Sequence, residues 1–120
     1  MKATKPMRYL WVFGVLASAM ALAQSNPVPW VNQPLVPTVV LPGGPSFTLT
    51  VNGTGFVSGS AVQWDGTALP TTFVNVSQLT ATVPASDIAT ARTASITVFN
   101  PSPGGGTSFV AFLEVSALPT

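Results

Sequence analysis

Apolar and polar residues alternate along most of the chain downstream of residue 46. Phe47, Leu49 and Val51 are separated by threonines. The same alternation returns in four later segments, namely 61–64, 79–83, 95–98 and 111–115. Because successive side chains of a β-strand point to opposite faces, this period of two predicts antiparallel strands with one buried face and one face rich in Thr and Ser.

Turn-forming residues separate these predicted strands. The segment 42–45 is Pro-Gly-Gly-Pro, and 101–106 contains two prolines and three glycines. Asp65-Gly66 favours a two-residue hairpin, because both residues tolerate a positive φ. Glycines on both sides of Phe56 predict a bulge or a bent crossing between two sheets.

One segment is predicted to be helical. Residues 84–89, Pro-Ala-Ser-Asp-Ile-Ala, offer Ser86 as an N-cap but are long enough for only one or two turns. We expect a short 3₁₀ or α turn that links strands of opposite sheets. About seven short strands with turns between them predict a two-sheet antiparallel β-sandwich, a fold in which turns recur roughly every 8–12 residues.

The apolar face of these strands defines the predicted core. Trp64 has the same parity as Val62, so it is predicted to be a core anchor, with a sugar-stacking surface Trp as the alternative. The predicted structural core comprises Phe47, Leu49, Val51, Phe56, Val62, Trp64, Leu79, Val83, Ile96, Val98, Leu113 and Val115.

Three apolar residues near the C-terminus have the opposite parity. Phe99, Val110 and Phe112 alternate with the core residues of the last two strands, which are predicted to be hairpin neighbours. The three side chains would then form one apolar patch on an outer face, a candidate interaction surface. The alternative is that the lead-in folds back, with Val28 or Trp30, and covers this patch.

The N-terminal residues follow a different pattern. Three basic residues among the first eight precede an apolar run over 10–22, which ends in Ala-Leu-Ala. This arrangement is typical of a signal-peptide helix, and the run is too short to span a bilayer. We therefore predict cleavage between Ala23 and Gln24 and a secreted, extracellular or periplasmic location. No stable membrane span is expected after cleavage.

The predicted organisation has four parts. Residues 1–23 are the signal peptide, and 24–34 are an extended lead-in, since three prolines in this segment favour extended backbone. Residues 35–116 form the β-sandwich domain, and 117–120 are a C-terminal tail.

The composition after residue 23 removes most catalytic chemistry. This part has no His, Cys, Lys or Tyr. Its charged residues are one base, Arg92, and three acids, Asp65, Asp87 and Glu114, which give a net charge of −2. A nucleophilic Ser would lack a base, and the scattered acids supply neither an acid–base pair nor a calcium site. Nucleic acid would require a basic face. We therefore predict a non-enzymatic protein with no catalytic residue, no cofactor and no metal.

Three motifs occur in a characteristic order. They are Gly-Thr-Gly-Phe at 53–56, Gln-Trp-Asp-Gly at 63–66 and Asn-Pro-Ser-Pro-Gly-Gly-Gly at 100–106. With the strands between them, they make the stretch 47–115 similar to the IPT/TIG family of immunoglobulin-like domains in its bacterial exported form. The resemblance implies an immunoglobulin-like sandwich without a disulfide and a module that is seldom catalytic. Relatives often continue into further modules, so the chain is either a stand-alone protein or the first module of a longer one.

Two functions are compatible with this sequence. The first is a structural, adhesion or protein-interaction role at the cell surface or outside the cell. The alternative is a carbohydrate-binding accessory module for an extracellular polysaccharide-acting enzyme. Loops of Thr, Ser, Asn and Gly offer hydrogen bonds without charge, so another extracellular domain or a neutral polysaccharide is a better partner than an ionic one.

Overall fold

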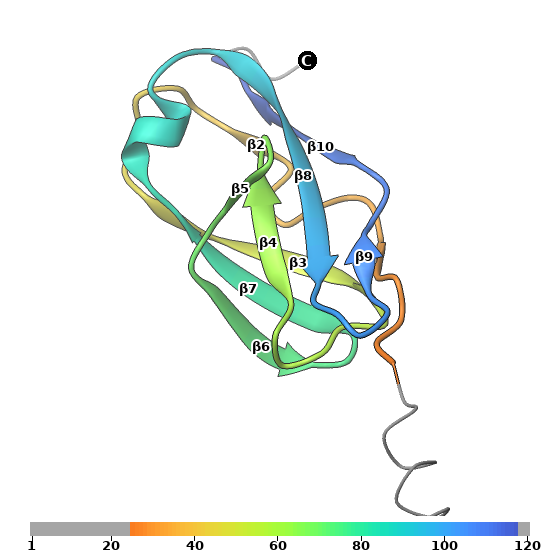
Figure 1. Cartoon of the computed structure of the whole chain (residues 1–120). Coiled ribbons are helices and arrows are strands. Elements are labelled where there is room, and N and C mark those ends of the chain that lie inside the picture. Colours follow the sequence, from red (N-terminus) through yellow and green to blue (C-terminus); the bar gives the residue numbers. More distant parts are fainter. Residues whose placement is uncertain (1–24, 118–120) are drawn as a thin grey trace, which may run out of the picture.

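The computed structural model describes residues 25–117, which form two β-sheets packed face to face (Figure 1). The predicted signal peptide, its cleavage point between Ala23 and Gln24, and residues 118–120 lie outside the described residues. No helix within 25–117 is long and apolar enough to cross a membrane.

The two sheets contain ten strands within the described residues, and four of these strands have only two residues. The first sheet has the order β1-β3-β7-β6, with bounds Trp30–Val31, Phe47–Thr54, Gln78–Val83 and Thr71–Asn75. The second sheet has the order β2-β10-β8-β4-β5, and β9 pairs with β8. Its bounds are Val39–Val40, Ala111–Val115, Arg92–Asn100, Ala61–Trp64, Thr67–Ala68 and, for β9, Gly106–Thr107.

The period-two pattern places the apolar residues between the sheets. In the first sheet Leu49 pairs with Ala81 and Val51 with Leu79, and all four side chains are buried. The alternate threonines point away from the core, as expected for strands with one solvated face. The predicted all-β sandwich is therefore confirmed.

Eleven of the twelve residues assigned to the core from the sequence are buried in the structure, and Phe47 is partly buried against them. The core also contains six residues outside the predicted core list, although Ala81 and Ala111 share the inward parity of their strands. The six are Leu35, Leu69, Ala81, Ile88, Ala94 and Ala111.

The expectation of purely antiparallel sheets was wrong at one edge. β2 runs parallel to β10, with Glu114 opposite Val39 and Val115 opposite Val40. The chain first follows β3, through β1 and a bridge between Val36 and Thr50, and then crosses to β10 after Pro37. Proline has no N–H to donate to a sheet, so the crossing occurs where pairing would be broken in any case.

The proline-rich lead-in is extended, but it is part of the sandwich rather than a segment that precedes it. Trp30 pairs with Thr54 and Val31 with Gly53, so β1 forms the edge of the first sheet. The sequence predicted that the domain starts at residue 35. In the structure the domain begins upstream of that residue, at β1 or earlier. Local patterning missed this strand because only two of its residues pair.

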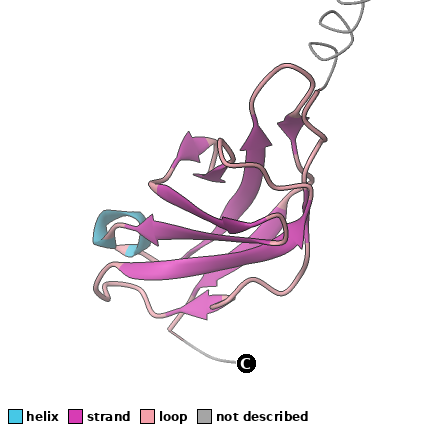
Figure 2. Ribbon diagram, turned by 90° about the horizontal axis from the view of Figure 1, so that it is seen from below, coloured by secondary structure: helices cyan, strands magenta, loops and turns pink. Residues whose placement is uncertain are grey.

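The turns match their sequence signals closely. Asp65 and Gly66 have φ values of 51° and 87° and connect β4 to β5 as a two-residue hairpin. The short 3₁₀ helix η2 (Ala85–Ile88) links β7 of one sheet to β8 of the other and lies at one end of the strands (Figure 2). Its N-cap is Pro84 without a side-chain hydrogen bond, so the expectation of Ser86 as the cap was wrong.

Candidate functional site

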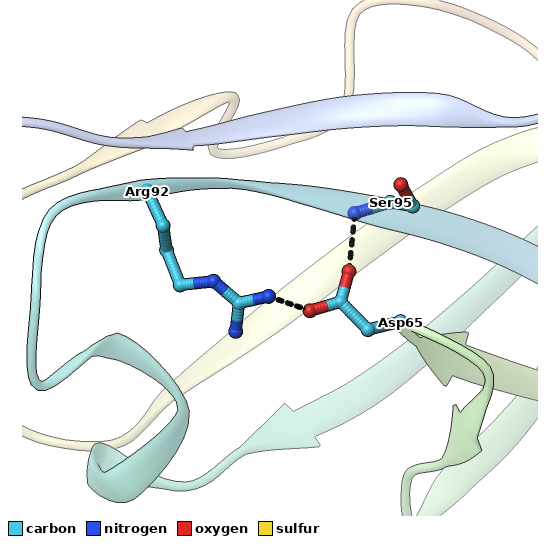
Figure 3. Close-up of polar contacts among 3 residues, drawn as sticks. All are labelled: Asp65, Arg92 and Ser95. Carbon is cyan, nitrogen blue, oxygen red and sulfur yellow. Dashed lines mark hydrogen bonds and ion pairs between the residues drawn. The ribbon is translucent and has the colours of Figure 1, made fainter.

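Three of the four ionisable side chains of the described residues, those of Asp65, Arg92 and Glu114, make contacts within the sandwich. Arg92 forms an ion pair with Asp65, whose Oδ1 also accepts a hydrogen bond of 2.8 Å from the backbone N–H of Ser95 (Figure 3). Together these contacts fasten the hairpin after β4 to the start of β8. Glu114 accepts a hydrogen bond of 3.0 Å from the hydroxyl of Thr93 on the neighbouring strand.

The three acids of the described residues lie on different elements of the sandwich. Asp65 lies in the hairpin turn after β4, Asp87 lies in η2 and Glu114 lies on β10. Among residues 25–117, no three His, Cys, Asp or Glu side chains are grouped so that they could hold a metal ion.

Asp65 offers a first test of how these contacts contribute to stability. Asp65→Asn is expected to lower the free energy of unfolding by less than about 1 kcal/mol, because the ion pair with Arg92 is half exposed and an amide oxygen still accepts the Ser95 N–H. Asp65→Val should cost more, since a β-branched residue is strained at a φ of 51°. Urea unfolding of both variants gives the comparison, and equal losses would contradict this account.

Trp64 is buried in the sandwich. Its side chain is only 3% exposed, and it lies on β4 opposite Ile96 of β8. A ring this deeply buried has no free face for a sugar to stack on, which removes the basis for its alternative role. The indole Nε1 has no hydrogen-bond partner among the described residues.

The apolar patch inferred from strand parity is exposed on the outer face of the second sheet. Phe99, Val110 and Phe112 are 40%, 42% and 56% exposed. Phe112 lies opposite Ser95, and Phe99 lies opposite Ala61, so both aromatic rings leave the sheet on the side away from the core. We call Phe99, Val110 and Phe112 the outer patch.

The lead-in does not cover the outer patch. The ring of Trp30 instead contacts that of Phe109, with centroids 5.6 Å apart and planes at 82°. Phe109 lies in the connection between β9 and β10 and is 76% exposed, so this aromatic pair adds to the exposed apolar surface. Strand parity gives no signal for Phe109, because this residue lies outside any alternating segment.

A polar cluster around Asn100 was also missed. The side chain of Asn100 is fully buried, and its Nδ2 donates to the carbonyl oxygens of Gly55 at 2.7 Å and Pro27 at 2.9 Å. Its Oδ1 accepts a hydrogen bond from the hydroxyl of Ser60. This amide therefore joins the lead-in, the crossing between β3 and β4, and the end of β8.

An apolar groove lies at the opposite end of the sandwich. Its volume is about 280 Å³, and its lining carries no charged side chain. It is lined by Pro37, Val40, Leu41, Gly44, Pro45, Phe47 and Ile88. Without polar side chains to orient a ligand, the groove lacks the fixed contacts that specific small-molecule sites use.

The fold and these contacts define an immunoglobulin-like β-sandwich. The profile of the IPT/TIG domain family matches residues 33–112. The chain therefore belongs to the IPT/TIG family, whose members are immunoglobulin-like modules used in protein interaction or adhesion. Comparison with curated proteins and with solved structures gave no match.

Proposed function

We propose that this chain is a non-catalytic, exported module that binds another extracellular protein through the outer patch. The observation that carries the proposal is the exposure of Phe99, Val110 and Phe112 on one sheet face. Contiguous exposed apolar side chains commonly mark sites of protein contact. An apolar contact also suits a domain in which three of the four charged side chains within residues 25–117 already bond within the fold.

Export is supported by the pattern of the first residues. A basic start, an apolar run over 10–22 and a small-residue end are the features that direct secretion. The described residues contain no cysteine, so the sandwich does not depend on disulfide formation in the compartment that it reaches. A role in adhesion at the cell surface would use the same outer patch.

A neutral polysaccharide is the second candidate partner, and one observation favours it. Trp30 and Phe109 are 52% and 76% exposed, and sugar rings stack on exposed aromatic faces. However, the two rings are almost perpendicular, whereas a flat polysaccharide chain would be held best by rings lying in one plane. The geometry therefore supports a protein partner better than an extended glycan.

Phe112→Ser tests the proposed interaction surface. Because Phe112 is more than half exposed and contributes little to the core, the free energy of unfolding of the variant should lie within about 0.5 kcal/mol of that of the unsubstituted protein. Binding should weaken at least about tenfold, as expected when a central aromatic contact of an interface is removed. The measurement is chemical cross-linking of the purified protein to exported proteins of the source organism, followed by affinity measurement on the captured partner.

Val74→Ser is the matched control for this experiment. Val74 is 47% exposed on β6, in the other sheet, so its substitution should leave capture unchanged. Equal binding by both variants would refute the outer patch as the interface, and a large loss of stability in Phe112→Ser would show that Phe112 is a packing residue. Retention on insoluble polysaccharide that Trp30→Ser abolishes would instead favour the glycan.

A further inference from the structure

Residues 25–31, here called the strap, lie in a groove formed by segments distant in sequence. The backbone N–H of Asn26 donates to Pro103 O at 2.8 Å, and the N–H of Gly105 donates to Asn26 O at 2.7 Å. The side-chain amide of Asn26 donates to Pro101 O at 2.8 Å. At its other end the strap pairs with β3 through Trp30 and Val31. Hydrogen bonds therefore hold the strap near both of its ends, at Asn26 and at the pairing with β3.

Glycines shape this groove to the strap. A Cβ added at Gly53 would overlap the carbonyl oxygen of Trp30, and one at Gly104 would lie 2.5 Å from the carbonyl oxygen of Asn26. A Cβ at Gly55 would lie 3.3 Å from the ring of Pro27. The buried amide of Asn100 completes the groove by donating to Pro27 O. The groove therefore fits closely against the backbone of one extended segment, with no room for a Cβ at Gly53 or Gly104.

The strap itself contributes little to the core. Pro29 is buried and Val31 packs partly against the core, whereas Val28 and Trp30 are 63% and 52% exposed. The connector that follows, 32–34, is exposed throughout, and the core resumes at Leu35. A segment held mainly by backbone hydrogen bonds, and joined to the core through an exposed connector, can leave its groove without unfolding the rest of the sandwich.

We propose that this groove is a strand-binding site that accepts the strap of a second copy of the chain, so that two copies exchange their straps reciprocally. Every contact of the strap would be made in the same way between copies, because both partners carry the same groove and the same segment. The exchange closes a two-fold dimer, in which each groove is filled once. This inference does not rest on the outer patch, since the strap is held through Asn26, Pro27, Trp30 and Val31 and none of these bonds involves Phe99, Val110 or Phe112.

The protein concentration determines whether a strap stays in the groove of its own chain or exchanges with the strap of a second copy. A tethered strap has an effective concentration of about millimolar for a short flexible connector, so dilute protein keeps its strap in its own groove. Copies crowded on a surface, or copies whose connector is too short to reach back, will exchange straps. Deletion of Asn32 and Gln33 should therefore convert the protein to dimers at concentrations where the unaltered chain is monomeric, as measured by analytical ultracentrifugation.

Designed disulfides test the exchange directly, because the described residues contain no cysteine. Trp30 and Thr54 face each other in the register of β1 with β3. A Trp30→Cys copy mixed with a Thr54→Cys copy at high concentration, then mildly oxidised, should give a disulfide-linked heterodimer. The matched control replaces Thr54→Cys with Thr48→Cys, which is also exposed on the same strand but lies opposite Thr82 of β7. The yield of disulfide-linked heterodimer should exceed that of the control about tenfold once the protein concentration approaches the millimolar range.

The double variant Trp30→Cys with Thr54→Cys shows whether the strap occupies its groove. Oxidised while dilute, it should form an internal disulfide and then stay monomeric at every concentration. Failure to form that bond would overturn the groove assignment. Equal heterodimer yields with Thr54→Cys and Thr48→Cys, or a connector deletion that remains monomeric, would overturn strap exchange while leaving the outer patch untouched.

Discussion

Trp64→Ala is expected to lower the free energy of unfolding by about 3–5 kcal/mol, the usual cost of truncating a buried tryptophan. The side chain is 3% exposed between the two sheets, so its removal leaves a cavity lined by rigid strands. Domains of this size are stable by about 5–15 kcal/mol, so the variant would lose a large part of the total. Urea unfolding followed by circular dichroism measures the change.

Trp64→Phe is the matched control for cavity formation. Phenylalanine keeps most of the ring volume and removes the indole N–H, which has no partner among residues 25–117 and is costly to bury unpaired. Trp64→Phe should therefore lower the free energy of unfolding much less than Trp64→Ala does. A Trp64→Ala variant that keeps full stability but no longer binds its partner would show that Trp64 is a binding residue instead.

The sandwich was predictable from sequence because every second residue of a strand with one buried face is apolar. Leu49, Val51, Leu79 and Val83 alternate with threonines, and the same residues fill the space between the sheets. Asp65-Gly66 was equally informative, since few other dipeptides accept two consecutive positive φ values. These are local signals, in which neighbours in the chain determine the conformation.

The parts that escaped prediction depend on contacts between distant segments. β1 has two paired residues and no alternating pattern, and it is held by Gly53 and Thr54 more than twenty positions away. The parallel pairing of β2 with β10 requires the chain to change sheets within a few residues. Neither feature leaves a periodic trace in the sequence, so only the assembled fold reveals them.

The candidate site was predicted only in part for the same reason. Strand parity placed Phe99 and Phe112 on an outer face, because parity is a local property. It could not say whether the lead-in covers them, which depends on where Trp30 lies. Asn100 shows the same limit: an Asn before a proline reads as a turn residue, and nothing nearby indicates that its amide is fully buried.

Asn100→Ala should lower the free energy of unfolding by about 3 kcal/mol, the second largest effect expected for this protein. The substitution leaves the Ser60 hydroxyl without its acceptor and the carbonyl groups of Gly55 and Pro27 without their shared donor. Unpaired buried polar groups cost about 1–3 kcal/mol each, and local rearrangement recovers part of this. Urea unfolding measures the loss, with the exposed Asn32→Ala expected to stay within about 0.5 kcal/mol.

Amide hydrogen exchange separates loss of the polar cluster from general destabilisation. If Asn100 fastens the strap, the N–H groups of Asn26 and Gly105, which bond across the strap–groove contact, should exchange faster in Asn100→Ala than global unfolding allows. Ser60→Ala removes the hydrogen bond to Asn100 Oδ1 and the one that Val57 N–H donates to Ser60 Oγ, without touching Pro27. It should therefore lower stability by about 2 kcal/mol and leave these two amides protected. Unchanged protection of Asn26 and Gly105 in Asn100→Ala would mean that the strap is held by its backbone pairing alone.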